Sequence, residues 1–274
     1  MSPTATTMIA RSITLPNDLR LEFVERGNAD GLPAIFLHGV TDSWGAFEGV
    51  LGRLPDHIHA IALSQRGHGN SSRPASGYHL SDFAADVVRL LDALEIPRVV
   101  VAGHSMGSLV AQQFATTYPE RTLGVVLMGS APDVRACEVL QAYARDEVAT
   151  LTDPIDPAFA REFQVSTIAR PVEEGLIDAC VLESLKVPAR VWREAFAGFV
   201  DADFTDALRA LRVPVLVASG DRDAFFPLDH ALRLHDLIPA SALLVYQGGG
   251  HAFHWEDPDT FVRDLVRFLD SIRE

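Results

Sequence analysis

Residues 99–109 read VVVAGHSMGSL, an apolar, β-branched run that ends in the pattern Gly-x-Ser-x-Gly. The run predicts a buried strand, and the apolar spacing of residues 111–118 predicts a helix directly behind it. The five-residue pattern also occurs by chance in loops, so the flanking strand and helix carry the prediction. In that context a tight turn holds the hydroxyl of Ser105 above the sheet, at a helix N-terminus that favours negative charge. We predict that Ser105 is a nucleophile, with Gly103 and Gly107 required where the strand and the helix pass closely.

The rest of the chain alternates between short apolar runs and helical patterns. This alternation predicts a mostly parallel, doubly wound α/β sheet with helices on both faces. Residues 11–26 instead alternate apolar and polar side chains around a Pro-Asn-Asp turn, so we expect an antiparallel hairpin at the sheet edge. The predicted buried strands are residues 34–37, 58–63, 99–102, 123–128, 213–218 and 243–246, and the predicted helices include residues 80–94 and 261–272.

Residues 132–205 interrupt this alternation. They contain no strong strand run, and prolines break their helical patterns. Their many apolar side chains exceed what a lid in water would tolerate, so some are expected to face the core or a pocket. We predict a helical cap inserted after the sixth strand, with an α/β core formed by residues 1–131 and 206–274.

The composition excludes some classes of protein. A chain of 274 residues with 48% hydrophobic content can bury a large core, and a formal net charge of −14 argues against nucleic acid or an anionic membrane as partner. Residues 1–8 lack the basic and apolar regions of a leader, and no apolar run approaches the ~20 residues that span a bilayer. We therefore expect a soluble, cytoplasmic protein. Reduced thiols are then the favoured state of Cys137 and Cys180, although the sequence leaves a bridge between them open.

Candidate partners for Ser105 follow the last two predicted strands. The carboxyl ends of parallel strands lie at one edge of a sheet, so residues just past them come together. Asp221 and Asp223 follow the first of these strands. His251 follows the second, after three consecutive glycines that let the loop bring its ring toward the serine. A serine nucleophile needs a base beside it and a carboxylate to orient that base, so this order predicts a catalytic triad.

These motifs resemble those of the α/β-hydrolase fold family, and the match runs across nearly the whole chain outside the predicted cap. The residues that carry it are His38-Gly39, Gly103-His104-Ser105-Met106-Gly107, Gly220-Asp221-Arg222-Asp223 and Gly250-His251. The resemblance implies that Asp223, the fourth residue of the Gly-x-x-Asp turn, orients His251, and that Asp221 is structural. Asp133, just after the preceding strand, is a less favoured alternative for the acid.

The glycine-rich loop at residues 64–71 has a different interpretation. Its spacing matches neither the dinucleotide fingerprint nor a P-loop, and no lysine follows it. We expect a structural turn with a buried or paired Arg66. Proteins of the α/β-hydrolase fold family often carry Asp-x-Arg-Gly-x-Gly-x-Ser at this point. In this chain Ser64 stands where they have the aspartate. This departure affects how Arg66 is held and leaves the catalytic roles unchanged.

The loop after the strand at 34–37 begins His-Gly. A glycine there lets the backbone turn and expose an amide. In an acyl-transfer enzyme the Val40 amide would then be one oxyanion donor and the Met106 amide the other, with His38 bracing the loop. A plain strand-to-helix turn is the alternative.

We expect a serine hydrolase, a carboxylesterase or lactonase, that forms an acyl-enzyme on Ser105 from a small, largely apolar ester or lactone without a cofactor. An aromatic pocket would suit such an acyl group. The predicted substrate contacts, each with a core role as the alternative, are Trp44, Phe225, Phe253 and Trp192. The same triad also serves cofactor-free perhydrolases (haloperoxidases) and carbon–carbon bond hydrolases, and a receptor-like protein with little turnover is the alternative of another class.

No metal site is predicted. His251 and His254 are three residues apart, as metal ligands can be, but no third ligand at sensible spacing accompanies them. The sequence leaves the natural substrate open, as it does the choice between monomer and homodimer.

Overall fold

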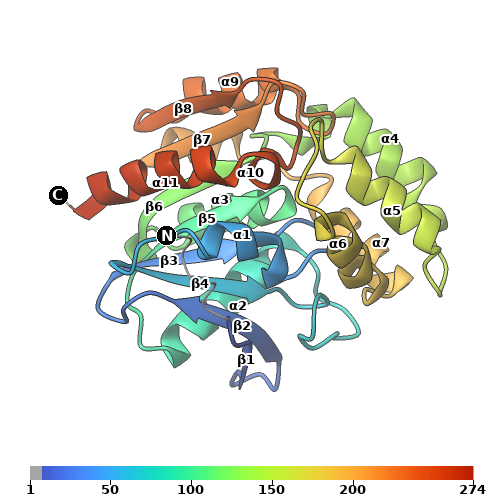
Figure 1. Ribbon diagram of the computed structural model, residues 1–274, viewed down its shortest axis with the longest axis horizontal. Coiled ribbons are helices and arrows are strands. Elements are labelled where there is room, and N and C mark those ends of the chain that lie inside the picture. Colours follow the sequence, from blue (N-terminus) through green and yellow to red (C-terminus); the bar gives the residue numbers. More distant parts are fainter. Residues whose placement is uncertain (1–7, 274) are drawn as a thin grey trace.

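The computed structural model describes residues 8–273 and is built around one eight-stranded sheet with helices on both faces (Figure 1). The mostly parallel α/β fold expected from the sequence is confirmed. Residues 1–7 and 274 lie outside the described part, and so does most of the N-terminal stretch on which the predicted absence of a leader rests.

The strands lie in the order β1-β2-β4-β3-β5-β6-β7-β8. Their bounds are Arg11–Thr14 (β1), Arg20–Arg26 (β2), Leu32–Leu37 (β3), Ile58–Ser64 (β4), Val99–His104 (β5), Thr122–Met128 (β6), Val215–Gly220 (β7) and Ser241–Tyr246 (β8). β2 pairs antiparallel with both β1 and β4, whereas every other pair of neighbours is parallel. The predicted hairpin at residues 11–26 is therefore confirmed as the antiparallel edge.

Helices cover the two faces of the sheet because successive side chains of each central strand point to opposite faces. In β5, Val99 and Val101 belong to the apolar cluster beneath α2, α3 and α9, whereas Val100 and Ala102 belong to the cluster beneath α1 and α11. These helices span Glu48–Leu51 (α1), Leu80–Ala93 (α2), Met106–Thr117 (α3), Leu228–Leu237 (α9) and Pro258–Arg273 (α11), with the short α10 at Phe253–Glu256. Both faces of the central strands are thereby buried.

Residues 132–205 contain no extended strand and lie between β6 and β7, as the interrupted sequence pattern predicts. In Figure 1 their helices form a layer beside one end of the sheet. The helices are α4 (Glu138–Asp146), α5 (Pro157–Ser166), α6 (Leu176–Leu185) and α7 (Ala189–Phe199), and α8 (Thr205–Arg209) leads back to the sheet. Short 3-10 turns occur at Trp44–Phe47, Pro119–Arg121, Val134–Ala136 and Val148–Thr150.

The parallel strands bring their carboxyl ends to this same end of the sheet. Leu37 of β3 lies opposite Gly103 of β5, and Gly220 of β7 lies opposite Tyr246 of β8. The loops that follow these strands carry the residues singled out from the sequence. The register of the sheet therefore places the loops after β3, β5, β7 and β8 in one neighbourhood.

The glycine-rich loop after β4 is a structural turn, as expected. Arg66 is buried and donates from Nε and Nη2 to the two carboxylate oxygens of Asp86, at 2.6 Å each. A third hydrogen bond, also 2.6 Å, joins its Nη1 to the Gly77 carbonyl. Ser64, the departure from the family pattern, instead donates to Glu22 on the neighbouring strand. Asp86 of α2 therefore holds the arginine.

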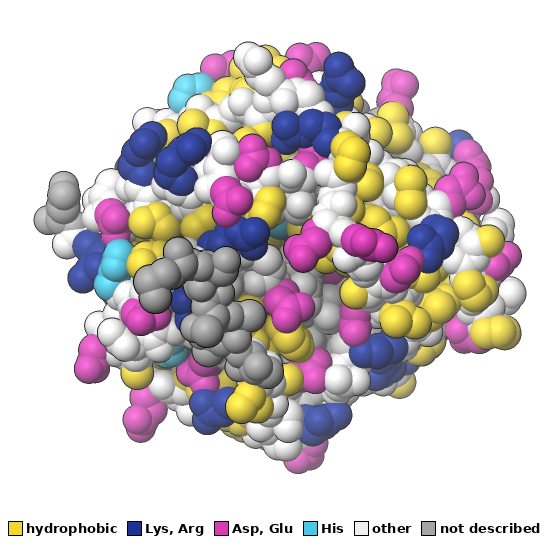
Figure 2. Space-filling model, in the orientation of Figure 1, with side chains coloured by type: hydrophobic (Ala, Val, Ile, Leu, Met, Phe, Trp, Pro, Cys, Tyr) yellow, Lys and Arg dark blue, Asp and Glu magenta, His cyan; other side chains and the backbone are white. Residues whose placement is uncertain are grey.

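The two cysteines, Cys137 and Cys180, are free and buried. None of the helices within residues 8–273 combines the length and the apolar character needed to cross a membrane. On the face shown in Figure 2, acidic and basic side chains are interspersed with apolar ones, so this face carries no large field of a single sign.

Candidate active site

Ser105 occupies the turn between β5 and α3. Its backbone has φ 53° and ψ −122°, a conformation that residues other than glycine rarely adopt. Close packing enforces the turn. A Cβ on Gly103 would lie 2.0 Å from the Gly107 carbonyl oxygen, and a Cβ on Gly107 would lie 2.0 Å from that of Leu37. Both clashes are with backbone atoms of the sheet and helix, so only glycine fits at either position. The strand and the helix do pass as closely as the sequence predicts.

His251 and Asp223 form a buried hydrogen-bonded pair. The 2.8 Å bond joins His251 Nδ1 to Asp223 Oδ2, and the two side chains are 3% and 0% exposed. Because a carboxylate only accepts, Nδ1 carries the proton and Nε2 is left as an acceptor. The other oxygen, Asp223 Oδ1, accepts the amides of Phe225 and Phe226 at 2.8 Å each. Asp223 is therefore fixed on both sides and sets the tautomer of His251.

Asp133, the alternative acid, lies elsewhere. Its carboxylate accepts from the backbone and the guanidinium of Arg135, and it caps the 3-10 turn that begins at Val134. Asp221 accepts the Gly248 amide at 2.6 Å and so braces the turn before the histidine. The structure thus pairs His251 with Asp223.

Ser105 and His251 line one cavity. Within residues 8–273, no hydrogen bond joins the serine hydroxyl to the imidazole. Such contacts are often long in a site without substrate and shorten when the reacting complex forms. The cavity therefore holds the candidate nucleophile Ser105 and the candidate base His251 in one space, with Asp223 hydrogen-bonded to the histidine.

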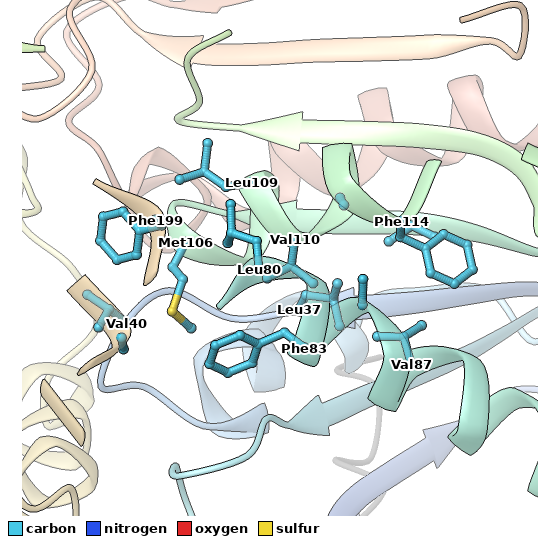
Figure 3. Packing of buried hydrophobic residues seen from close by; sticks show 14 of the residues in the cluster. Leu37, Val40, Leu80, Phe83, Val87, Met106, Leu109, Val110, Phe114 and Phe199 are labelled. Atoms are coloured by element: carbon cyan, nitrogen blue, oxygen red, sulfur yellow. The ribbon is translucent and has the colours of Figure 1, made fainter. Parts of the chain in front are cut away.

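The predicted oxyanion residues, Val40 and Met106, also line this cavity. Met106 is the first residue of α3, where backbone N–H groups have no partner within the helix. His38 holds the Val40 loop as expected, since its Nδ1 donates to the Gly39 carbonyl at 2.7 Å and its Nε2 accepts the Gln65 amide at 2.9 Å. In Figure 3 the side chains of Val40 and Met106 lie together at the end of the apolar cluster nearest the helical segment between β6 and β7.

The remaining wall is mostly aromatic and comes largely from the segment between β6 and β7. The apolar lining residues are Leu140, Phe163, Phe196, Phe199, Phe225 and Phe226. The polar ones beyond the predicted site are Asp42, Gln164, Thr167 and His104. No lysine or arginine is among the lining residues that the structure describes, so the cavity offers no cation to a substrate carboxylate.

The four predicted substrate contacts do not come together. Phe225 lines the cavity, but Trp44 lines a separate hollow on the other side of Asp42. Trp192 is completely buried against Phe163, with ring centroids 5.2 Å apart. Phe253 stacks on Tyr246 at 4.5 Å, in the core between the sheet and α11. The expectation is therefore corrected for Trp44, Trp192 and Phe253, whose aromatic character serves packing.

Asp42 and Gln164 are two polar cavity residues that the sequence analysis missed. Burial raises the pKa of Asp42 to about 7, although the hydrogen bond from Gln164 acts in the opposite direction. Asp42 follows the His-Gly turn by only a few residues, which was a usable signal. Gln164 lies far along the chain in α5, where nothing in the local pattern marks it.

A group of histidines packs behind the candidate base. His104 donates from Nε2 to the His251 carbonyl at 3.1 Å, and its ring centroid lies 4.5 Å from that of His254. Burial lowers the pKa of His254 to about 3 and that of His104 well below its ordinary value, so both are neutral. In the described part of the chain no cluster of three potential ligands could hold a metal ion.

Known proteins resemble this chain throughout its length. The sequence model of the Alpha/beta hydrolase family matches residues 34–264. A non-heme chloroperoxidase of Streptomyces lividans is 30% identical, covering 95% of this chain and 99% of its own. The 3-oxoadipate enol-lactonase 2 of Acinetobacter baylyi is 27% identical, over 89% and 91%. Among solved structures, an esterase of a Rhodococcus species superposes with a TM-score of 0.82 at 25% identity, covering 96% of this chain and 99% of that one.

Proposed function

Since the chain belongs to the alpha/beta hydrolase family, we propose that it is a serine hydrolase that cleaves a small, largely apolar carboxylic ester or lactone through an acyl-enzyme on Ser105. The observation that carries this proposal is the Asp223–His251 pair, which shares a cavity with a serine on a strained strand-to-helix turn. A purely structural turn would not need these three groups together.

The proposed mechanism begins with His251 Nε2, which accepts the hydroxyl proton of Ser105 as the oxygen attacks the substrate carbonyl. Asp223 stabilises the imidazolium that forms. The Val40 and Met106 amides are assigned to the oxyanion, and each such donor is worth about 3 kcal/mol of barrier in comparable enzymes. The histidine then protonates the leaving alcohol oxygen. Water attacks the acyl-enzyme with His251 again acting as the base, which releases the acid and frees the serine.

The cavity wall supports a neutral, partly apolar substrate. Its phenylalanines offer apolar surface to an acyl chain, and the absence of lysine and arginine among the described lining residues disfavours a carboxylate next to the carbonyl. We therefore assign this chain an uncharged ester or lactone. Residues 132–205 are assigned as the cap that closes over it.

A second activity of the same site is perhydrolysis, favoured by the similarity to a non-heme chloroperoxidase. Hydrogen peroxide would replace water in attacking the acyl-enzyme, which would release a peracid and the free serine. Assays with acetate and hydrogen peroxide, with the peracid measured directly, separate this activity from ester hydrolysis.

The test is steady-state hydrolysis of p-nitrophenyl esters from acetate to decanoate. We expect turnover well beyond one equivalent, with a chain-length optimum, and a loss of several orders of magnitude in Ser105→Ala. Ser271→Ala, an exposed serine near the end of α11, is the matched control and should retain full activity. Equal rates in wild type and Ser105→Ala would overturn the serine mechanism, and a single equivalent of product would favour the receptor-like alternative.

A further inference from the structure

We propose that Asp42 and Gln164 form a polar subsite that binds a hydroxyl or amino group carried by the substrate next to its scissile carbonyl. This inference rests on the proposed hydrolase function and names the substrate class more closely. It concerns two polar side chains of a cavity whose wall includes five phenylalanines.

Gln164 lines the cavity and carries an unused acceptor. Its Nε2 donates both hydrogens, to Asp42 Oδ1 at 3.0 Å and to Ser184 Oγ at 2.9 Å. Its Oε1 is buried without a hydrogen-bond partner within residues 8–273, and the whole residue is 1% exposed. A buried amide oxygen without a partner is unfavourable, so a ligand that donates to it recovers free energy.

Asp42 presents a second acceptor. Its Oδ1 is taken by Gln164, whereas its Oδ2 accepts nothing from the described residues. No lysine, arginine or histidine in the described part of the chain forms an ion pair with this carboxyl group, and the nearby charge is another carboxylate, Glu183. Burial and Glu183 both raise the pKa of Asp42. A donor from the substrate is therefore the partner that this buried group lacks.

The position of Asp42 places this donor close to the reacting carbonyl. A Cβ built on Gly39 would lie 3.1 Å from Asp42 Oδ2 and 3.3 Å from the Cβ of Ser105. Asp42 Oδ2 and the side chain of Ser105 thus border the same small volume. A substrate whose carbonyl carbon reaches the serine has its adjacent carbon beside Asp42. Two acceptors with no cation suit O–H or N–H donors and reject an anion.

A structural role is the competing explanation. Gln164 lies on α5 and Asp42 on the loop after β3, so their hydrogen bond also ties the two segments together. That tie would affect all substrates alike. The preference for one substrate over another, measured within a single variant, separates the two roles.

The experiment compares three γ-butyrolactones that differ only at the carbon next to the carbonyl: α-hydroxy, α-amino and α-methyl. The methyl group matches the donors in size. Measurements at pH 8, above the pKa of about 7, keep Asp42 ionised as an acceptor. The kcat/KM of the hydroxy lactone and that of the amino lactone are each divided by the kcat/KM of the methyl lactone. This ratio is measured for wild type, Asp42→Ala, Asp42→Asn and Gln164→Leu. Glu183→Gln is the control, because it removes the neighbouring carboxylate outside the cavity.

We expect the wild type to prefer the hydroxy or the amino lactone over the methyl lactone by about 10- to 100-fold, as for a hydrogen bond to a charged group. Whether the wild type prefers the hydroxy or the amino lactone identifies the donor as O–H or N–H. The ratio should fall to about 1 in Asp42→Ala, decrease in Gln164→Leu, and persist in Glu183→Gln. It should also decrease in Asp42→Asn, because the single amide oxygen stays with Gln164 Nε2 and an NH₂ group replaces the free acceptor. A wild type without preference, or a preference that persists in Asp42→Ala, overturns the subsite.

A fluorophosphonate that phosphonylates serine nucleophiles separates this result from failure of the proposed function. If Ser105 is not labelled and no ester or lactone is turned over, the hydrolase proposal fails. If Ser105 is labelled but lactone turnover is too slow, protection against labelling is compared instead. Protection by the α-hydroxy or α-amino lactone but not by the α-methyl one supports the subsite, and equal protection by all three overturns it.

Discussion

Asp223 accepts a 2.8 Å hydrogen bond from His251 Nδ1 while its second oxygen is held by two backbone amides. The carboxylate therefore has no freedom to rotate away from the imidazole. Its orientation is set by the turn that follows β7, before any substrate binds. The pair is consequently a preorganised element of the site, and its chemistry depends on the acceptor character of Asp223 Oδ2.

Asp223→Asn tests that dependence. The asparagine oxygen can still accept the hydrogen bonds of the Phe225 and Phe226 amides. Its NH₂ group then faces His251, which forces the ring proton from Nδ1 to Nε2. The ring can then no longer accept the proton of Ser105. We expect kcat for p-nitrophenyl ester hydrolysis to fall by about 10³–10⁴-fold with KM changed little. Steady-state kinetics on the folded variant measure both constants.

The matched control is Asp133→Asn, which changes the carboxylate that the sequence analysis gave as the alternative acid. Asp133 pairs with Arg135 and does not contact the histidine. Its replacement should change kcat by less than about twofold, because Asp133 is not among the residues that line the cavity. The reverse pattern, with Asp133 essential and Asp223 dispensable, would contradict the assignment.

Much of this arrangement could be predicted from the sequence because it depends on local patterns. An apolar, β-branched run such as residues 99–102 is typical of a buried parallel strand, and the end of that strand fixes the location of the next loop. The Gly-x-Ser-x-Gly turn likewise carries its own geometry, since only glycine fits beside the backbone at Gly103 and Gly107. Strand ends and turn residues together predicted the neighbourhood of Ser105, Asp223 and His251.

The lining of the cavity could not be predicted in this way. Trp192 and Phe163 both belong to apolar helical faces of the same segment, yet only Phe163 borders the cavity. Periodicity shows that a face is buried, but a core and a pocket present the same pattern. The Asp42–Gln164 bond joins residues 122 positions apart, so it depends on how α5 packs over the sheet.

Gly107→Ala tests the close approach of α3 to β3. The new methyl group would meet the Leu37 carbonyl oxygen at 2.0 Å, and neither backbone segment can move without disrupting the sheet. We expect a loss of about 3 kcal/mol or more in the free energy of unfolding, measured by urea denaturation. Gly49→Ala is the control, because the nearest atom to its new Cβ is the Arg53 guanidinium at 3.7 Å. It should leave stability unchanged or raise it by up to about 1 kcal/mol. Similar losses in both variants would contradict a specific role for the contact between Gly107 and the Leu37 carbonyl.

Asp86→Ala tests the buried ion pair between Arg66 and Asp86. The change leaves the Arg66 guanidinium buried without its two 2.6 Å acceptors. Removing one partner of such a pair typically costs about 3–5 kcal/mol. The double variant Arg66→Met, Asp86→Leu removes both charges and should recover most of that loss in chemical denaturation. A double variant no more stable than Asp86→Ala would show that the shape of the pair, rather than its charge balance, matters.

His254→Phe tests the pH dependence that the buried histidines impose. Its ring packs near Phe47 and Phe261, with centroids 5.6 and 6.0 Å away, and neither ring nitrogen has a hydrogen-bond partner within residues 8–273. Burial lowers the pKa of His254 from 6.5 to about 3. The unfolded chain therefore binds a proton below pH 6.5 that the folded chain excludes, so this residue makes the wild type less stable as the pH falls from 6.5 toward 3.

Phenylalanine binds no proton in either state and removes that dependence. At pH 8 the two proteins should differ by less than about 1 kcal/mol, because the ring shapes are similar. At pH 5 the free energy of unfolding of the variant, relative to that of the wild type, should be about 2 kcal/mol higher than at pH 8. This figure is the interval of about 1.5 units between pH 6.5 and pH 5, at about 1.4 kcal/mol per unit. Urea denaturation at both pH values measures this change. Parallel pH profiles for the two proteins would mean that His254 is protonated in the folded state or reached by water, and that the stack behind His251 is not the dry, neutral packing described above.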